Sequence, residues 1–267
     1  MQNSYLLQPI KITNIEELTN DTRLFTFNFS FAKFIPGQFL MLSIPGFGEA
    51  PFGIMAPNYT DGRLQLLIRK VGALTSKIFE LRKGNTMFVR GPLGNGFPLG
   101  ELKNKNIMMF AGGTGIVPLK AMIDYIRSHQ KNFDKIQFFY GAKNPENIFF
   151  QKELGSYRKF AEILLTVEAP SNNWEENIGL VTSLISKKTV IADNSAALLC
   201  GPPVMYKRVA EKLQKLGFEN KKIYLLFERR IRCGIGKCQH CTCGNKYVCL
   251  DGPVFRYDET LKFPEGI

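Results

Sequence analysis

Residues 228–255 read ERRIRCGIGKCQHCTCGNKYVCLDGPVF and contain five of the six cysteines of the chain. The spacing Cys-x4-Cys-x2-Cys, followed by a later Cys, is the plant-type ligand pattern of an iron–sulfur cluster, in which four thiolates converge on a compact inorganic core. Gly234 and Gly236 lie between the first two cysteines and make positive φ angles available, so the backbone can fold tightly there. The stretch therefore predicts an electron-transfer site.

The predicted cluster ligands are Cys233, Cys238, Cys241 and Cys249, with Cys243 spare. The x4 and x2 spacings place the first three, which leaves Cys243 and Cys249 to compete for the fourth position. Gly244-Asn245 offers a turn that brings the chain back, so that Cys249 can supply the fourth thiolate. Three alternatives stay open: Cys243 as the fourth ligand, a structural zinc knuckle, and a disulfide cluster.

The length of 267 residues, 45% of them hydrophobic, allows two domains with room for a small third lobe. The formal net charge is +12, but the lysines are dispersed among apolar positions, which argues against a nucleic-acid partner. The segment from Lys207 to Lys237 contains ten Lys or Arg residues but only three Glu residues. This excess predicts a surface for an acidic partner, and a solvated helix face is the alternative.

The N-terminal residues lack the basic region and long apolar run of a signal peptide. The most apolar long segment, 107–119, contains three glycines and is too short to span a membrane. Clustered cysteines without an export signal point to a reducing compartment and a metal role. We therefore expect a cytoplasmic protein without a membrane span.

Residues 10–90 show short apolar runs separated by turn residues, which predicts antiparallel strands and a small barrel. Residues 24–31 alternate aromatic with small polar side chains, as a half-buried strand does. Asp61-Gly62 predicts a hairpin turn before a strand at 63–69. A short helix is expected at 74–81, a last strand at 86–90, and the breaker-rich run 91–98 as the end of the first domain.

Strands and helices alternate after residue 105, which predicts a doubly wound parallel sheet with helices on both faces. The fold class is thus α+β and α/β: an antiparallel β-barrel, a parallel-sheet domain and a small C-terminal lobe. The expected domain boundaries are 1–100, 101–227 and 228–267. The expected strands are 106–111, 135–140, 161–167, 196–200 and 223–228, and the expected helices are 118–128, 146–154 and 204–216.

Two turns, at residues 112–115 and 200–203, follow predicted strands of this sheet. Doubly wound folds bind their ligands at such strand ends. Glycines in Gly112-Gly-Thr-Gly115 would let a pyrophosphate approach the backbone, and the following helix offers free N–H groups and a positive dipole end. A tight structural turn is the alternative for each. The predicted dinucleotide-binding residues are Gly112, Gly113, Thr114, Gly115, Pro118, Cys200, Gly201, Pro202 and Pro203.

Taken together, these pieces resemble the ferredoxin–NADP reductase superfamily, in which a barrel holds a flavin and two such turns hold a nicotinamide nucleotide. The cysteine lobe is similar to the iron–sulfur flavoprotein branch, which includes electron-transfer subunits of dihydroorotate dehydrogenases, gamma subunits of sulfhydrogenases and B subunits of anaerobic sulfite reductases. The resemblance covers nearly the whole chain, and the sulfite reductase subunit is the most similar. The stretches that carry this similarity are 46–51, 90–98, 228–238 and 251–255.

The resemblance implies a barrel that binds FAD. The implied flavin-binding residues are Ala50, Pro51, Phe52, Gly53, Leu67, Ile68, Arg69, Leu74 and Thr75. Relatives commonly have Arg-Pro-x-Ser in the first segment, whereas this chain has Ala50 and Gly53. The missing guanidinium and hydroxyl remove two flavin contacts, and backbone groups remain to hold the cofactor.

The resemblance also implies the function: electrons pass from NADH through FAD to a [2Fe-2S] cluster and on to a partner. The expected partners are the catalytic and additional iron–sulfur subunits of a sulfite reductase-type complex. A sulfhydrogenase or dihydroorotate dehydrogenase is the alternative, and a non-enzymatic metal-knuckle protein is another. Because the cofactors carry out the electron transfer, the reaction requires no acid–base residue of the protein. The segment 141–147 contains both a lysine and a glutamate, so it does not decide between NADH and NADPH.

Overall fold

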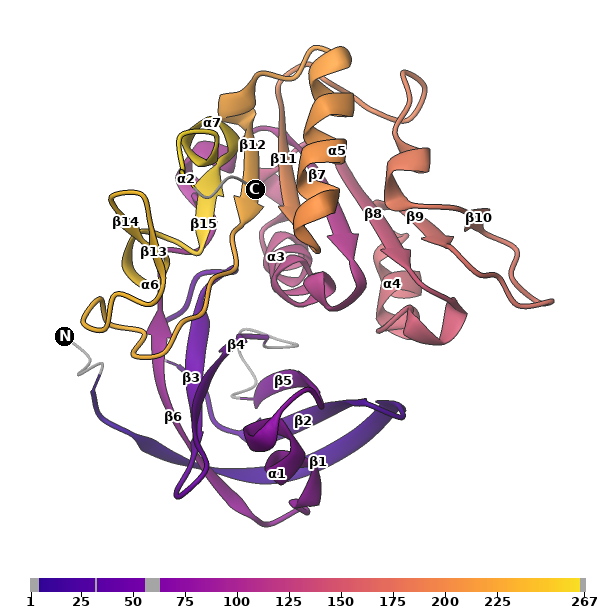
Figure 1. Ribbon diagram of the computed structural model, residues 1–267. Helices are drawn as coiled ribbons and strands as arrows, with labels where there is room; N and C mark the ends of the chain where they lie inside the picture. Colours follow the sequence, from indigo (N-terminus) through magenta and orange to yellow (C-terminus); the bar gives the residue numbers. More distant parts are fainter. Residues whose placement is uncertain (1–4, 32, 56–62, 265–267) are drawn as a thin grey trace.

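The computed structural model describes residues 5–31, 33–55 and 63–264, which form two sheets and a small lobe (Figure 1). The first sheet has the strand order β4-β3-β6-β1-β2-β5, with all neighbours antiparallel. Its elements are β1 (Gln8–Thr19), β2 (Thr22–Asn28), β3 (Phe39–Ile44), β4 (Gly48–Gly53), β5 (Arg63–Arg69), α1 (Ala73–Glu80) and β6 (Thr86–Leu93).

This sheet closes on itself because Met55, just after β4, pairs with Gln65 on β5. Every second residue points inward, and Ile10, Ile12, Phe25 and Phe27 are fully buried in the core of the barrel. The predicted antiparallel barrel is confirmed. The predicted turn at Asp61-Gly62 lies outside the described residues.

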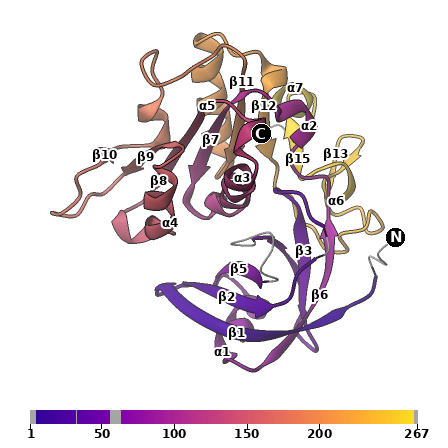
Figure 2. The ribbon, with the colours of Figure 1, turned by 180° about the vertical axis from the view of Figure 1, so that it is seen from behind.

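The second sheet has the order β10-β9-β8-β7-β11-β12-β15 and is parallel from β10 to β12. Its helices α3 and α4 pack on one face (Figure 2) and α5 packs on the other, as predicted for a doubly wound fold. The elements are α2 (Leu99–Leu102), β7 (Asn106–Gly112), α3 (Ile116–Ser128), β8 (Ile136–Ala142), α4 (Gln151–Tyr157), β9 (Glu162–Val167), β10 (Asn177–Ile178), β11 (Ser195–Cys200), α5 (Pro203–Lys215) and β12 (Ile223–Leu226). Short 3-10 turns are η1 (Gly113–Gly115), η2 (Gln130–Asn132), η3 (Pro145–Asn147), η4 (Val181–Leu184) and η5 (Asn220–Lys222).

The helix predicted at 146–154 is wrong in extent. The turn η3 ends at Asn147, and α4 begins only at Gln151. Phe150 between them has a left-handed backbone with φ of 61°, which interrupts any continuous helix. Elsewhere β6 runs on to Leu93, because that residue pairs with Phe39.

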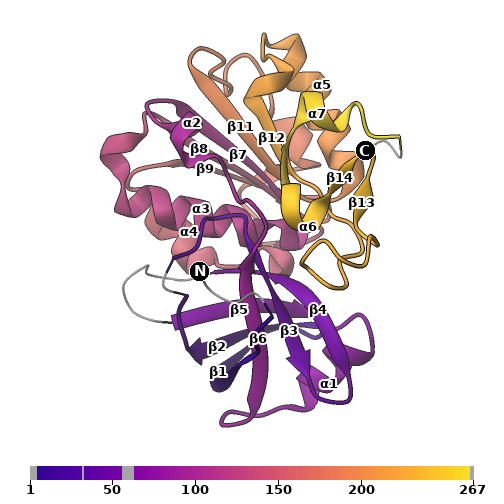
Figure 3. The same ribbon diagram turned by 90° about the vertical axis from the view of Figure 1, so that its left-hand side faces the viewer.

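The C-terminal lobe folds back onto the second sheet (Figure 3). Its elements are β13 (Thr242–Cys243), β14 (Lys246–Tyr247), α6 (Val248–Asp251), β15 (Val254–Arg256) and α7 (Tyr257–Thr260). Strand β15 pairs antiparallel with β12, so the cysteine-rich stretch is anchored at both ends to the same sheet edge. The barrel also holds it, because the Asn95 side chain donates to the carbonyls of Asp251 and Val254 at 2.8 Å each.

Within the described part of the chain, the helices are all too short or too polar to cross a bilayer.

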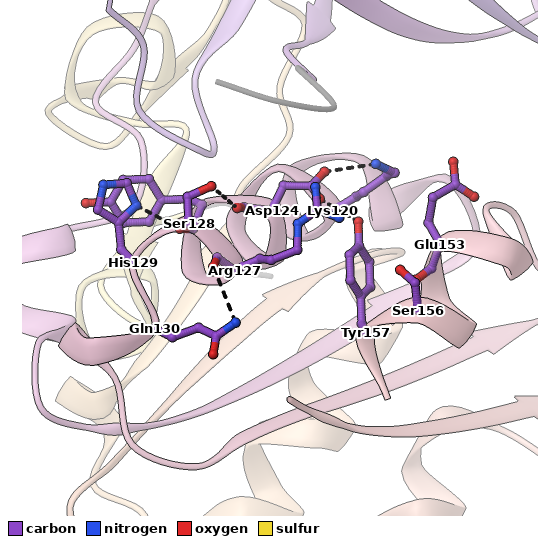
Figure 4. A network of polar contacts seen from close by, with 10 residues as sticks. Lys120, Asp124, Arg127, Ser128, His129, Gln130, Glu153, Ser156 and Tyr157 are labelled. Atoms are coloured by element: carbon purple, nitrogen blue, oxygen red, sulfur yellow. Dashed lines mark hydrogen bonds and ion pairs between the residues drawn. The ribbon is translucent and has the colours of Figure 1, made fainter. Parts of the chain in front are cut away.

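A buried ion network ties α3 to α4 (Figure 4). Asp124 is 2% exposed, and its carboxylate lies 2.9 Å from Lys120 Nζ. Tyr157 donates its hydroxyl to the same carboxylate at 2.6 Å, and burial followed by the charge of Asp124 raises the pKa of this phenol. Arg127 approaches from the more exposed side at 3.1 Å. The Asp124 carboxylate is therefore the shared partner of Lys120, Arg127 and Tyr157.

We expect Asp124→Ala to lower the free energy of unfolding by about 3–5 kcal/mol, because Lys120 would be left charged and buried without its partner. The matched control is Glu80→Ala, which breaks the exposed helical pair with Lys77 and should cost less than about 1 kcal/mol. Urea denaturation of both variants measures the difference. A loss for Asp124→Ala no larger than that of the control would contradict this reading of the network.

Candidate functional site

A cleft of about 540 Å³ lies where the barrel, the second sheet and the start of the cysteine lobe meet. Strand β4 and the end of β5 form the barrel side, and both predicted nucleotide turns form the opposite side. The chain after β12 closes it. Of the predicted residues, the cleft contains Ala50, Pro51, Phe52, Gly53, Leu67, Arg69, Thr75, Thr114, Gly115, Pro118 and Cys200.

Two of the residues implied for flavin binding lie elsewhere. Ile68 is fully buried in the barrel core, and Leu74 packs against the same core. On β5 the side chains alternate, so Leu67 and Arg69 face the cleft while Ile68 between them faces inward. The alternation of side chains along β5 therefore separates the cleft-lining residues from the core residue.

The absence of a side chain at Gly53 has a structural cause. A Cβ at this position would lie 2.8 Å from Cγ1 of Val117 on α3. Real Cβ atoms do not approach so closely, so a serine here would require Val117 to move. Gly53 therefore lets the barrel pack closely against the first turn of α3, at the edge of the cleft.

The rim of the cleft carries a fixed cation and an ordered helix start. Arg69 Nε lies 2.7 Å from a carboxylate oxygen of Asp21, and this hydrogen bond holds the pKa of Asp21 below its ordinary value. Thr75 accepts hydrogen bonds from the backbone N–H groups of Val71 and Gly72, both at 2.9 Å. A cation and a helix N-terminus at one rim suit an anionic group such as a phosphate.

The two glycine turns touch each other at the point where the strand order reverses, between β7 and β11. A Cβ on Gly115 would lie 2.3 Å from the carbonyl oxygen of Cys200, and one on Gly112 would lie 3.0 Å from Pro202 Cδ. Gly113 differs, because its φ is 54° and no atom lies within 4 Å of a Cβ there. Close packing thus requires two of these glycines, and the third faces open space.

Gly113 faces a second cleft of about 280 Å³ along the carboxyl ends of the parallel strands. Gly112 and Pro202 line it as well, whereas Gly201 packs under Gly112 and Pro203 begins α5. A third cleft of about 760 Å³ adjoins it, lined by Gly113, Thr114 and the loop after β8, and it reaches Arg69. Residues of one turn therefore line all three clefts.

Apart from Arg69 and the lysine and glutamate of the segment 141–147, the charged residues of these clefts were not predicted from the sequence. Glu228, directly after the last buried strand residues, lines the first cleft, and desolvation there raises the pKa of its carboxyl. Burial, followed by the charge of Glu228, raises the pKa of the Cys200 thiol. Glu168, Lys143 and Arg208 line the second cleft. In the sequence, only their positions after predicted strands or on a predicted helix could have indicated that these residues line a cleft.

All six cysteines are free thiols, and the lobe brings four of them into mutual contact or electrostatic range. Cys233 Sγ accepts hydrogen bonds from the N–H groups of Lys237 and Cys238, both at 3.3 Å. Cys249 Sγ accepts one from Gly236 at 3.2 Å. Burial and the Cys241 thiol raise the pKa of Cys249 to about 12, whereas the His240 N–H lowers that of Cys238 to about 7.

Backbone N–H groups directed at sulfur are what an anionic iron–sulfur cluster requires, so this donor set fits such a group. Gly234 and Gly236 adopt the expected positive φ angles of 67° and 72°. Among the described residues, no three His, Cys, Asp or Glu side chains are arranged for a single metal ion.

Cys243 occupies a different environment. It is completely buried, and its sulfur lies 3.7 Å from Nη2 of Arg229, whose guanidinium stacks over the ring of Phe227. Cys243 is therefore placed by its contact with Arg229, and the described contacts of its sulfur lie outside the group of Cys233, Cys238, Cys241 and Cys249.

The basic residues of 207–237 divide into three groups. Four of them are exposed on α5: Lys207, Arg208, Lys212 and Lys215. Lys221 and Lys222 both form ion pairs of 2.7 Å with Glu219. Only Arg229, Arg230, Arg232 and Lys237 belong to the cysteine lobe.

Three protein families match consecutive parts of the chain: the oxidoreductase FAD-binding domain at residues 9–97, the oxidoreductase NAD-binding domain at 109–211, and the iron–sulfur cluster binding domain of dihydroorotate dehydrogenase B at 228–261. The sulfhydrogenase 2 subunit gamma of Pyrococcus furiosus is 38% identical, over 97% of this chain and 98% of its own length. A probable dihydroorotate dehydrogenase B electron transfer subunit of Pyrococcus abyssi is 34% identical, over 97% and 94%.

Among solved structures, an NADH-dependent reduced ferredoxin–NADP oxidoreductase superposes with a TM-score of 0.78, over 95% of this chain and 91% of its own, at 22% identity. The CS-b5R domains of human Ncb5or, in the NAD+ form, superpose with a TM-score of 0.72, over 82% of this chain and 69% of their own, at 20% identity. At such identities the likeness shows the fold alone. The named relatives favour the sulfhydrogenase and dihydroorotate dehydrogenase alternatives over the sulfite reductase subunit that the sequence motifs favour.

Proposed function

Since this chain belongs to the ferredoxin–NADP reductase-like FAD- and NAD-binding oxidoreductases that carry the dihydroorotate dehydrogenase B iron–sulfur domain, we propose that it oxidises NADH and passes the electrons singly to a partner. It is an NAD(P)H-dependent flavin oxidoreductase subunit. The proposal adds NADH as donor, a [2Fe-2S] cluster as the outlet, and a sulfhydrogenase- or dihydroorotate dehydrogenase-type catalytic subunit as acceptor.

One observation carries the proposal. The first cleft contains the predicted flavin strand, both glycine turns and, through Ile231, the chain that reaches Cys233 two residues later. This shared lining supports a donor site, a flavin site and a cluster loop that adjoin one another. When bound, the flavin would accept a hydride and the cluster would take single electrons.

The side chains position and enclose these groups. Gly113 and the start of α3 offer backbone N–H groups for a pyrophosphate at the switch point of the sheet. Pro51, Phe52, Val117 and Phe227 give the first cleft apolar walls that exclude water from a bound ring. Glu228 lines the same cleft as Cys200, and its charge contributes to the raised pKa of the Cys200 thiol.

Glu168 supports NADH as the donor. It stands at the carboxyl end of β9 in the second cleft, where a carboxylate can accept hydrogen bonds from ribose hydroxyls and would repel a 2′-phosphate. Lys143 and Arg208 share the cleft and would bind that phosphate once the carboxylate is neutral. We expect Glu168→Gln to reduce the NADH/NADPH ratio of kcat/KM by about tenfold, or about 1.4 kcal/mol.

Steady-state kinetics with both nucleotides and an artificial acceptor measure that ratio. Glu175→Gln is the matched control, because Glu175 is exposed in the same connection and lines none of the described clefts. An unchanged ratio in Glu168→Gln, or an equal change in the control, would remove Glu168 from nucleotide selection.

Anaerobic purification with the native partners tests the proposed assembly. The purified protein should show the visible absorption of flavin and of an iron–sulfur cluster. It should also co-purify with a catalytic subunit of the hydrogenase or dihydroorotate dehydrogenase type. Co-purification with a sulfite-reducing subunit would instead favour the expectation drawn from the sequence motifs. A colourless protein after anaerobic isolation would leave only the metal-knuckle alternative.

A further inference from the structure

Arg90 joins the barrel to the cysteine lobe through a buried ion pair. The residue is on β6 and is 7% exposed. Its Nε and Nη2 donate to the two carboxylate oxygens of Glu49 at 2.7 and 2.6 Å. Nη2 also donates to the backbone carbonyl of Cys233 at 2.6 Å. One guanidinium therefore connects two strands of the barrel with the cysteine loop.

The two ends of this connection are the two proposed cofactor sites. Glu49 directly precedes Ala50, the first residue of the flavin segment on β4. Cys233 is the first cysteine of the cluster spacing. The loop also lies close to the barrel beside this contact, since a Cβ on Gly234 would approach Leu93 Cδ1 to 2.9 Å. The position of Arg90 is therefore fixed relative to both sites.

We propose that the Arg90–Glu49 pair is a positioning and tuning device that sets the reduction potential of the cluster relative to the flavin. This inference rests on the proposed function, because it requires a cluster at the four cysteines. Each electron added to the cluster adds negative charge, which a buried cation stabilises. Arg90 touches the loop directly, whereas Glu49 contacts the guanidinium and partly cancels its charge.

Removal of the charge of Arg90 and removal of the charge of Glu49 should shift the reduction potential of the cluster in opposite directions. Arg90→Gln should lower the cluster potential, because it removes the cation. Glu49→Gln should raise it, because it removes the negative charge that offsets part of the Arg90 charge at the loop. Arg90→Lys keeps the charge and should remain near the wild-type potential. For each charge-removing variant we expect about a tenfold change in the flavin-to-cluster equilibrium, or about 59 mV for a one-electron couple.

Anaerobic redox titration of the full chain, with the cluster followed by electron paramagnetic resonance and the flavin by absorbance, measures these shifts. Arg23→Gln is the matched control, because Arg23 also joins a glutamate, Glu17, to a backbone carbonyl, that of Phe79, but lines none of the described clefts. It should leave the potential unchanged.

Shifts of the same sign in Arg90→Gln and Glu49→Gln, or no shift in either, would overturn the proposal. If Arg90→Gln loses iron, Glu49→Gln and Arg90→Lys still decide, since both retain a cation at the loop. Iron content of the wild-type chain separates the two levels of inference. A wild-type protein without iron contradicts the proposed function, whereas a loaded cluster with unmoved potentials contradicts this inference alone.

Discussion

Cys249→Ser should abolish the visible absorption of the iron–sulfur cluster, whereas Cys243→Ser should keep it. Cys249 is buried, accepts the Gly236 N–H and lies against Cys241, so its sulfur belongs to the group of four. Cys243 is buried beside Arg229. A serine at 249 provides a weaker ligand at a position that the loop cannot replace.

Iron and sulfide content and the anaerobic visible spectrum of each variant measure this prediction. The pair is its own control, since both substitutions exchange one buried sulfur for oxygen in the same lobe. Cluster loss in Cys243→Ser with retention in Cys249→Ser would reverse the assignment and make Cys243 the fourth ligand.

The second large effect concerns nucleotide binding. Gly113→Val should reduce kcat/KM for NADH by about 100-fold, the cost of displacing a bound group by about 1 Å, while bound flavin remains. The valine side chain would enter the open space that the second and third clefts share. The flavin strand, β4, is on the other side of the first cleft and stays intact.

Backbone strain needs its own control, because φ of 54° at Gly113 disfavours valine wherever it occurs. Gly217 has a φ of 95°, is equally surrounded by open space, and follows α5 outside all described clefts. Gly217→Val should therefore cost stability but spare NADH kinetics. Equal loss of NADH activity in both variants would show that the effect is strain alone.

Local sequence patterns predict the parts of this molecule that depend on short spacings. The cysteine spacing predicts a loop whose glycines adopt positive φ, and the alternating strand periods predict both sheets. The glycine turn is predicted at a strand end, and it lies at the reversal of strand order. In each case the information lies within about ten residues of sequence, where periodicity and turn chemistry decide the structure.

Long-range contacts are what the sequence could not supply. Arg90 and Cys233 are remote in sequence and meet only because the lobe folds onto the barrel. The return of β15 to the sheet edge and the entry of Glu168 into a cleft depend on topology in the same way. The helix predicted at 146–154 failed because Phe150 takes a left-handed conformation that residue propensities do not reveal.

We propose that this chain alone carries electrons from NADH through flavin to the cluster. The most direct measurement is anaerobic addition of NADH to the isolated, cofactor-loaded chain, with absorbance and electron paramagnetic resonance recorded over time. We expect flavin bleaching and the signal of a reduced cluster without any partner, and no cluster reduction in flavin-free protein. A cluster that stays oxidised, or that is reduced equally well without flavin, would contradict this route of electron transfer.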